Sequence, residues 1–233
     1  MRDPLPTLFI PALGSTPRLY ADQLPHVWQF GPVIVTGPTR DDSMSAIAKR
    51  ILADAPPRFS LVGLSMGGYI SLEILRQAPG RVAKLALLDT SARPDAPEQS
   101  EGRRATIALA RSGRFGEIAD MLYPRLVDKS RHNEAALKQI VRTMAQEVGP
   151  DAFVRQQTAI MTRPDSRPSL ASIRCPALVL VGESDAITPL EVASELATGI
   201  AASRLVKVPG SGHLSSLEQP AAVTRALLEL LQS

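Results

Sequence analysis

Short apolar runs alternate with longer amphipathic patterns along most of the chain. Several of these runs are nearly continuous in aliphatic residues, as in Leu85-Ala86-Leu87-Leu88, which is the composition of strands buried on both faces of a sheet. Strands that alternate with helical patterns are typical of βα units around a mostly parallel sheet. The sequence therefore predicts an α/β fold, with strands at Thr7–Pro11, Pro32–Thr36, Phe59–Gly63, Leu85–Asp89, Ala177–Val181 and Arg204–Val208.

Amphipathic patterns between and after these strands predict the helices that cover the sheet. Their ends carry recognisable signals, because Ser43 is a good N-cap residue and Pro79-Gly80 follows the pattern that begins at Met66. The last pattern keeps its Ala, Leu and Val residues on one face. The helices are expected at Ser43–Ala53, Met66–Gln77, Leu190–Leu196 and Ala221–Leu231.

Residues 92–167 interrupt this alternation. The segment has helical patterns but no strand-like run, and prolines bracket it. We interpret it as a helical cap inserted into a core formed by residues 1–91 and 168–233. Its helices are expected at Arg103–Arg111, Phe115–Leu122, Glu134–Val148 and Asp151–Met161.

Length, composition and charge are those of an ordinary globular protein. A chain of 233 residues with 44% hydrophobic and 21% charged residues suits one large core. The net charge of +3 is spread along the chain without a run of five basic residues, whereas nucleic-acid binding needs a concentrated basic stripe. We therefore expect no nucleic-acid partner.

The single cysteine and the lack of long apolar segments indicate the compartment. Cys175 has no second cysteine to pair with, which suits a reducing environment. No stretch reaches 18 apolar residues and the N-terminus has no apolar signal region. We expect a soluble, cytoplasmic protein with no membrane partner. Because no paired metal-ligand spacing and no glycine-rich phosphate loop occurs, we expect neither a metal nor a cofactor.

The most specific motif lies between a predicted strand and a predicted helix. Gly63-Leu64-Ser65-Met66-Gly67 fits the G-x-S-x-G pattern of a nucleophile elbow, in which a sharp strand-to-helix turn raises a serine hydroxyl above the sheet. The glycines on either side of Ser65 have no Cβ, so neighbouring backbone can pack closely against the turn. This context predicts that Ser65 is a nucleophile.

A serine hydroxyl needs an adjacent base to take its proton. The chain has three histidines. His26 is expected on a helix or loop surface and His132 in a polar connection of the cap. His213 follows the last predicted strand, and loops at the carboxyl ends of parallel strands are where such folds place their chemistry. His213 is therefore the predicted base.

The acid that orients the base is expected in the loop after the penultimate strand. Asp185 lies there, and its carboxylate can accept the second imidazole N–H of His213 and stabilise the imidazolium. Glu183 is a weaker candidate in the same loop. Asp89 also ends a predicted strand and is the serious rival, although we expect it to cap the following turn or line the site.

The order Ser65, Asp185, His213 is that of the α/β-hydrolases, and the chain resembles this superfamily over nearly its whole length. It is most similar to small capped bacterial esterases, including enol-lactone hydrolases and acyl-carrier methyl ester esterases. The resemblance implies a mostly parallel six-stranded core sheet, since two early strands of many relatives have no counterpart here. It also implies an oxyanion hole formed by the backbone N–H groups of Met66 and Leu13. Relatives often carry His-Gly where this chain has Pro11-Ala12.

The resemblance further implies hydrolysis of a small-molecule carboxylic ester or lactone through an acyl-enzyme. The apolar side chains of the cap are candidate pocket walls, although any one of them could instead pack the cap onto the core. They are Phe115, Met121, Leu122, Tyr123, Phe153 and Met161. Of these, Tyr123 and Met161 are expected to contact the substrate. The same triad could instead serve a C–C bond hydrolase, a lyase or a cofactor-free perhydrolase. A non-catalytic ligand-binding protein on this fold is disfavoured by the intact triad, and a dehalogenase by Ser65, because a dehalogenase would carry Asp at that position.

Overall fold

The predicted strands all form, and they lie in one parallel sheet. The computed structural model describes residues 4–233. The strand order is β2-β1-β3-β4-β5-β6, and every neighbouring pair is parallel. The predicted six-stranded α/β fold is therefore confirmed. The strands are β1 (Thr7–Ile10), β2 (Val33–Val35), β3 (Phe59–Leu64), β4 (Val82–Leu88), β5 (Ala177–Gly182) and β6 (Ser203–Val208).

Strand ends differ from the prediction by up to three residues. β4 begins at Val82, three residues before the predicted start, because Val82 pairs with Phe59 at the first position of β3. β4 also ends at Leu88, one residue before the predicted end, because Asp89 leaves the extended conformation with a φ of 44°. The apolar pattern thus located the centre of each strand more accurately than its ends.

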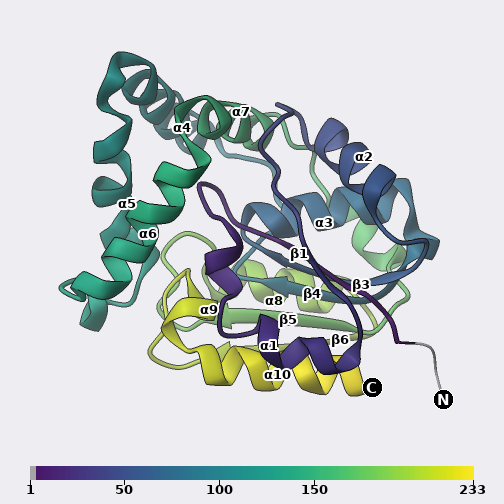
Figure 1. Ribbon diagram of the computed structural model, residues 1–233. Helices are drawn as coiled ribbons and strands as arrows, with labels where there is room; N and C mark the ends of the chain where they lie inside the picture. The colour runs from purple at the N-terminus through teal and green to yellow at the C-terminus, as the bar shows by residue number, and fades with distance from the viewer. Residues whose placement is uncertain (1–3) are drawn as a thin grey trace.

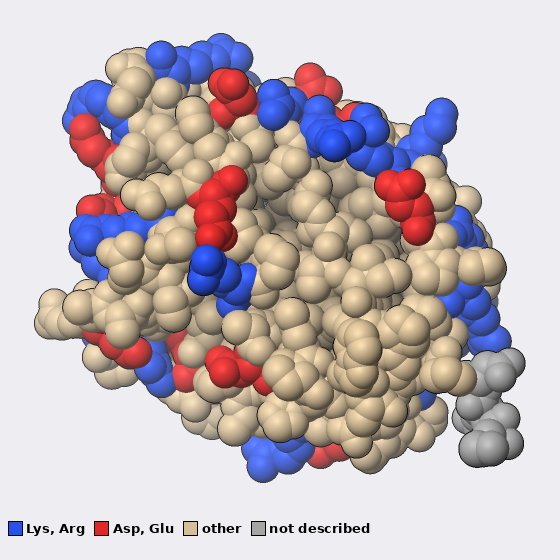
Figure 2. Space-filling view, viewed as in Figure 1, with Lys and Arg blue, Asp and Glu red and all other residues tan. Residues whose placement is uncertain are grey.

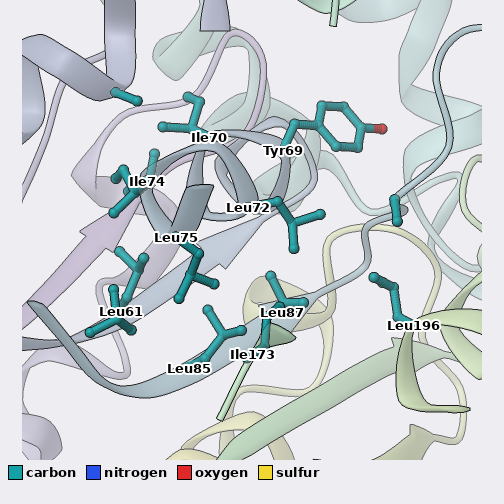
Figure 3. Packing of buried hydrophobic residues seen from close by; sticks show 14 of the residues in the cluster. Leu61, Tyr69, Ile70, Leu72, Ile74, Leu75, Leu85, Leu87, Ile173 and Leu196 are labelled. Carbon is teal, nitrogen blue, oxygen red and sulfur yellow. The ribbon is translucent and has the colours of Figure 1, made fainter. Parts of the chain in front are cut away.

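The sheet has a hydrophobic cluster on each face, because side chains of a strand alternate between faces. One cluster includes Leu61, Leu85 and Leu87, and Figure 3 shows the last two beside Leu72 and Leu75 of a covering helix. The opposite cluster includes neighbours in the same strands such as Val62. Residues of β3 and β5 are buried at every position, which explains their continuous apolar sequence.

Helices cover both faces of the sheet (Figure 1). On one face lie α2 (Met44–Asp54), α3 (Met66–Gln77) and α8 (Leu190–Gly199), whose apolar side chains join the cluster of Leu61. On the other face lie α1 (Leu24–Val27) and α10 (Pro220–Gln232). Ser43 caps α2 as predicted, because its side chain accepts a hydrogen bond from the backbone N–H of Ala46.

Residues between β4 and β5 are helical and extend away from the sheet toward the upper left of Figure 1. α4 begins six residues before the predicted start, and Gly113, with φ 82°, interrupts the helical backbone before α5. The helices are α4 (Pro97–Leu109), α5 (Ile118–Leu126), α6 (Ala135–Val148) and α7 (Pro150–Met161). α9 (Ser215–Glu218) follows β6, and shorter turns occur at Pro17–Tyr20, Trp28–Phe30, Pro79–Arg81, Ala110–Arg114, Phe115–Glu117, Lys129–Arg131 and Arg167–Ser172.

Charged side chains of both signs are interspersed around the margin of the face shown in Figure 2. The centre of that face is occupied mostly by residues that are neither basic nor acidic. None of the helices in residues 4–233 has the length and apolar composition needed to cross a membrane.

The sheet and α3 lie in close contact at Gly67. A Cβ atom on Gly67 would overlap the backbone carbonyl of Ile10 at the end of β1. Such an overlap with backbone forces the strand and the helix apart, because a carbonyl oxygen has no rotamer through which to move away.

The variant Gly67→Ala should therefore lower the free energy of unfolding by about 1–3 kcal/mol. The matched control is Gly102→Ala, since Gly102 also lies within a helix but has no atom within 4 Å of an added Cβ. That variant should be neutral or gain up to about 1 kcal/mol from helix propensity. Chemical denaturation of both variants measures the difference, and equal stabilities would contradict the close approach.

Candidate active site

Ser65 occupies the turn between β3 and α3 in a strained backbone conformation. Its φ and ψ are 54° and −113°, a region that costs a non-glycine residue about 1–3 kcal/mol. Surrounding groups hold it there. The N–H of Ser65 donates to the carbonyl of Leu88 at 2.9 Å, and its own carbonyl accepts from Thr90 Oγ1 at 2.7 Å.

Two positions near Ser65 have no room for a side chain and therefore require glycine. A Cβ on Gly63 would overlap the carbonyl of Gly67 and the hydroxyl of Ser71, and a Cβ on Gly68 would overlap the side chain of Thr90. The turn is therefore packed on both sides, and it directs the hydroxyl of Ser65 away from the sheet toward the loops that follow the strands.

The three residues predicted as nucleophile, base and acid lie in a continuous chain of hydrogen bonds. Ser65 Oγ and His213 Nε2 are 2.8 Å apart, and His213 Nδ1 and Asp185 Oδ2 are also 2.8 Å apart. The exposed fractions of Ser65, Asp185 and His213 are 8%, 4% and 2%. The other histidines lie elsewhere, with His26 exposed on α1 and His132 in the connection between α5 and α6.

Asp185 is held as a carboxylate by donors from its own loop. The N–H groups of Ile187 and Thr188 donate to Oδ1, and the hydroxyl of Thr188 donates to Oδ2 at 2.7 Å. Burial alone would raise the pKa of Asp185, but the imidazole of His213 and these donors outweigh it and lower the pKa to about 2.

The contact between Asp185 and His213 lowers the pKa of Asp185 and raises that of His213. Burial favours the neutral imidazole, but the adjacent carboxylate of Asp185 outweighs this effect and raises the pKa of His213 above its usual value. The arrangement thus stabilises an imidazolium when His213 takes a proton from a neighbouring group. Sequence analysis did not identify Thr188, whose role depends on a contact within the loop.

Asp89, the rival acid, binds the loops rather than the imidazole. Its Oδ1 accepts from the N–H of Gly182 at 2.9 Å, and its Oδ2 accepts from the N–H and hydroxyl of Ser215. Burial and the nearby charge of Asp185 raise the pKa of Asp89 to about 8. Asp89 therefore joins the end of β5 to the start of α9, on either side of the loops that carry Asp185 and His213. Glu183, the weaker candidate, is exposed.

The two predicted oxyanion donors follow neighbouring strands. Leu13 lies in the loop after β1 and Met66 is the first residue of α3, directly after Ser65. Within residues 4–233, the N–H groups of Leu13 and Met66 donate to no protein acceptor. β1 and β3 also mark the point where the strand order reverses, because β2 lies on the opposite side of β1. The crevice at such a switch point is where open α/β sheets bind their ligands.

Glu218 is a buried residue of the site that sequence analysis missed. Its carboxylate accepts from the N–H groups of Gly212 and Leu214, on either side of His213, and from that of Asp128 after α5. The N–H of His213 itself donates to the carbonyl of Leu126 at 3.0 Å. Burial raises the pKa of Glu218, and the backbone donors oppose that effect. The loop of His213 is therefore fastened both to α9 and to the end of α5.

The two residues predicted to contact substrate have different surroundings. Tyr123 is buried in α5, and its hydroxyl donates to the carbonyl of Arg131 at 2.9 Å. Met161 ends α7 and is half-buried. A contact of either residue with substrate stays a prediction. Phe153 of α7 packs against Leu13 of the loop after β1, and its ring lies 5.4 Å from that of Phe115.

A cavity of about 330 Å³ lies between α5 and α6. Its lining includes Phe115, Ala119 and the ion pair of Asp120 with Arg142. In the described part of the chain, no group of three or more His, Cys, Asp or Glu side chains is arranged to hold a metal ion.

Known proteins share both this fold and parts of the sequence. A thermophilic esterase from Thermogutta terrifontis superposes with a TM-score of 0.87 and 31% identity, covering 98% of this chain and 89% of that one. The enol-lactonase from Burkholderia xenovorans superposes with a TM-score of 0.87 over 99% of this chain and 92% of that one, at 23% identity, and so shows the fold alone.

Sequence comparison adds a curated relative of similar length. A pimeloyl-[acyl-carrier protein] methyl ester esterase from Edwardsiella ictaluri is 26% identical over 227 residues, which are 94% of this chain and 85% of the relative. The model of the alpha/beta hydrolase family matches residues 7–226. With its parallel sheet and its strand-turn-helix at Ser65, the chain belongs to the alpha/beta hydrolase family.

Proposed function

We propose that this protein is a serine hydrolase that cleaves a carboxylic ester or lactone of a small molecule through an acyl-enzyme. One observation carries the proposal, namely the two hydrogen bonds of 2.8 Å that join Ser65 Oγ to His213 and His213 to Asp185. This geometry is that of a nucleophile, its general base and the group that orients the base.

The first half of the reaction forms the acyl-enzyme. His213 Nε2 takes the proton of Ser65 Oγ as this oxygen attacks the carbonyl carbon of the substrate. Asp185 stabilises the imidazolium that results. The carbonyl oxygen gains negative charge and accepts hydrogen bonds from the N–H groups of Leu13 and Met66, where the N-terminus of α3 adds a favourable dipole.

Collapse of the tetrahedral intermediate completes the acyl-enzyme, as His213 gives its proton to the leaving alcohol oxygen. In the second half of the reaction, water occupies the place of the alcohol, gives a proton to His213 and attacks the acyl carbon. The second tetrahedral intermediate then collapses, the bond between Ser65 Oγ and the acyl carbon breaks, and His213 returns its proton to Ser65 Oγ as the acid leaves. A lactone follows the same path, except that its alcohol stays joined to the acyl chain, so that the product is a single hydroxy acid.

The relatives support ester-like bonds as the substrate class. One is named a methyl ester esterase, one an esterase and one an enol-lactonase. A series of p-nitrophenyl esters of graded chain length, assayed beside a panel of lactones, tests the class. Hydrolysis in either panel supports the proposal, whereas a wild-type enzyme inactive on both would refute it.

The variant Ser65→Ala should lose about 10³-fold or more of kcat on the best ester. The reason is that the substitution removes the attacking oxygen. The structure of Ser65→Ala should remain intact, which circular dichroism checks. Near wild-type kcat in this variant would remove Ser65 from the mechanism.

The variant Asp185→Asn should change both the rate and its pH dependence. His213 must be neutral to accept the proton of Ser65, so kcat/KM falls as pH drops through the pKa of His213. The carboxylate of Asp185 raises that pKa. Its loss should move the acid limb of kcat/KM to lower pH, while the plateau falls by about 10⁴-fold.

Asp89→Asn is the matched control for this experiment, since Asp89 is equally buried but bonds Gly182 and Ser215 instead of His213. Its loss of kcat/KM should be smaller than that of Asp185→Asn. If Asp89→Asn were the more damaging variant and Asp185→Asn nearly silent, the acid would be Asp89.

We further propose that residues 92–167 form a lid that selects the substrate, because α5 contacts the loop of His213 and Phe153 of α7 lies beside the loop of Leu13. Met161→Ala should then change chain-length preference by about 1–3 kcal/mol, while phosphonylation of Ser65 by a small fluorophosphonate stays unchanged. Tyr123→Ala is a poorer test because it opens a cavity in α5.

Met121→Ala is the matched control, since Met121 belongs to the same segment but is 51% exposed. It should leave chain-length preference unchanged. Equal loss on every ester and on the small probe in Met161→Ala would mean that the segment takes part in catalysis itself.

A further inference from the structure

Gln156 is a fully buried polar residue of α7 that the catalytic scheme leaves unexplained. Its side chain is 0% exposed and uses both ends of its amide. Oε1 accepts a hydrogen bond from the N–H of Gly14 at 3.0 Å, and Nε2 donates to the carbonyl of Pro38 at 3.1 Å. One side chain thus joins α7 to the loops that follow β1 and β2.

The contact with Gly14 falls in the turn that holds the proposed oxyanion donor. The N–H of Ser15 donates to the carbonyl of Ala12 at 3.1 Å and closes a four-residue turn around Leu13 and Gly14. Gly14 has φ 63°, as the third residue of a type II turn requires. In such a turn the middle peptide, here between Leu13 and Gly14, sets the turn type by its orientation.

Gln156 accepts the N–H of that middle peptide. A flip of the peptide would break this bond and leave the buried acceptor Oε1 of Gln156 unsatisfied, which is unfavourable. The N–H of Leu13 belongs to the preceding peptide, whose carbonyl at Ala12 is bonded to Ser15. The direction of the Leu13 N–H therefore depends on the turn keeping its shape. Gln156 holds the N–H side of the middle peptide, and the hydroxyl of Ser15 donates to its carbonyl side, at Leu13, over a longer distance of 3.4 Å.

We propose that Gln156 is a positioning residue, which keeps the loop of Leu13 in the shape that presents its N–H to a developing oxyanion. The proposal rests on the hydrolase mechanism proposed above. Because Gln156 belongs to α7, it also makes the oxyanion hole depend on the position of this helix. Movement of α7 away from the sheet breaks the bond to Gly14 and releases the turn.

The neighbouring Gln157 supplies a matched comparison. It lies on the same helix and is 2% exposed, but its amide donates to Thr106 Oγ1 and accepts from Arg103, both on α4. Replacing its amide by an apolar group removes two buried hydrogen bonds between α7 and α4 and none to the loop of Leu13. Comparing variants of the two glutamines therefore distinguishes an effect on the packing of α7 from an effect on the turn.

The experiment compares Gln156→Leu with Gln157→Leu in the full-length enzyme. A trifluoromethyl ketone analogue of the best ester is the probe. Ser65 Oγ adds to its carbonyl carbon, the serine proton passes to His213, and the ketone oxygen becomes an anion that occupies the oxyanion hole. Affinity for this inhibitor therefore reports on the hole, whereas KM for the ester reports mainly on ground-state binding.

In Gln156→Leu, kcat and inhibitor affinity should each fall by about 10-fold or more, since removing an oxyanion donor outright costs about 10²–10³-fold. KM should stay within about 3-fold, as expected for a group that acts on the transition state. In Gln157→Leu, kcat and inhibitor affinity should stay within about 2-fold even if the melting temperature falls. Circular dichroism at the assay temperature confirms that each variant is folded.

Equal losses of kcat in the two variants, or unchanged inhibitor affinity in Gln156→Leu, would overturn the assignment. Gln156→Asn carries the same expectations if the leucine variant does not fold, because the shorter amide does not reach Gly14 and Pro38 together. A wild-type enzyme that neither hydrolyses esters nor binds the ketone would refute the proposed function instead, so the two failures are distinguishable.

Discussion

Ser65 has a backbone conformation that it would not adopt on its own, and the rest of the site is arranged around that conformation. A positive φ of 54° persists only where surrounding structure fixes it. Here the fixing groups are the end of β4, which accepts the N–H of Ser65, and the hydroxyl of Thr90, which donates to its carbonyl. The absence of a side chain at Gly63 and Gly67 lets strand and helix approach closely enough to form the turn.

The parallel sheet brings the remaining groups to the same edge. Leu13 follows β1, Ser65 follows β3, Asp185 follows β5 and His213 follows β6. Because carboxyl ends of parallel strands meet at one edge, residues distant in sequence converge there. Two further buried acidic side chains then join the loops to one another. Asp89 bonds the end of β5 to α9, and the acceptor oxygens of Glu218, which lies five residues after His213, hold the backbone on both sides of the histidine.

The features predicted well from the sequence are those that depend on local pattern. Continuous aliphatic runs identified the buried strands, and the glycines around Ser65 identified the turn, because both follow from the immediate chain. Asp185 and His213 were chosen by their place after predicted strands, and the structure puts both within hydrogen-bonding distance of their partners.

Features that depend on a side chain meeting distant backbone leave no such pattern. Gln156 accepts a hydrogen bond from the N–H of Gly14, and Glu218 accepts one from that of Asp128. In the sequence, however, a buried Gln or Glu of a helix cannot be distinguished from an exposed one. For Tyr123 the sequence pattern indicated a role in substrate contact that the structure does not test. Its apolar surroundings in sequence suited a pocket wall equally well, whereas its hydroxyl bonds the carbonyl of Arg131 inside the helical segment.

We expect the strained turn to make Ser65 uniquely reactive among the serines of the chain. The direct measurement is peptide mapping by mass spectrometry after reaction with a fluorophosphonate. We expect one phosphonyl group, located on Ser65 within the tryptic peptide 59–76, which also contains Ser60 and Ser71. Label on another residue, or an unlabelled Ser65 in an enzyme that hydrolyses esters, would contradict it.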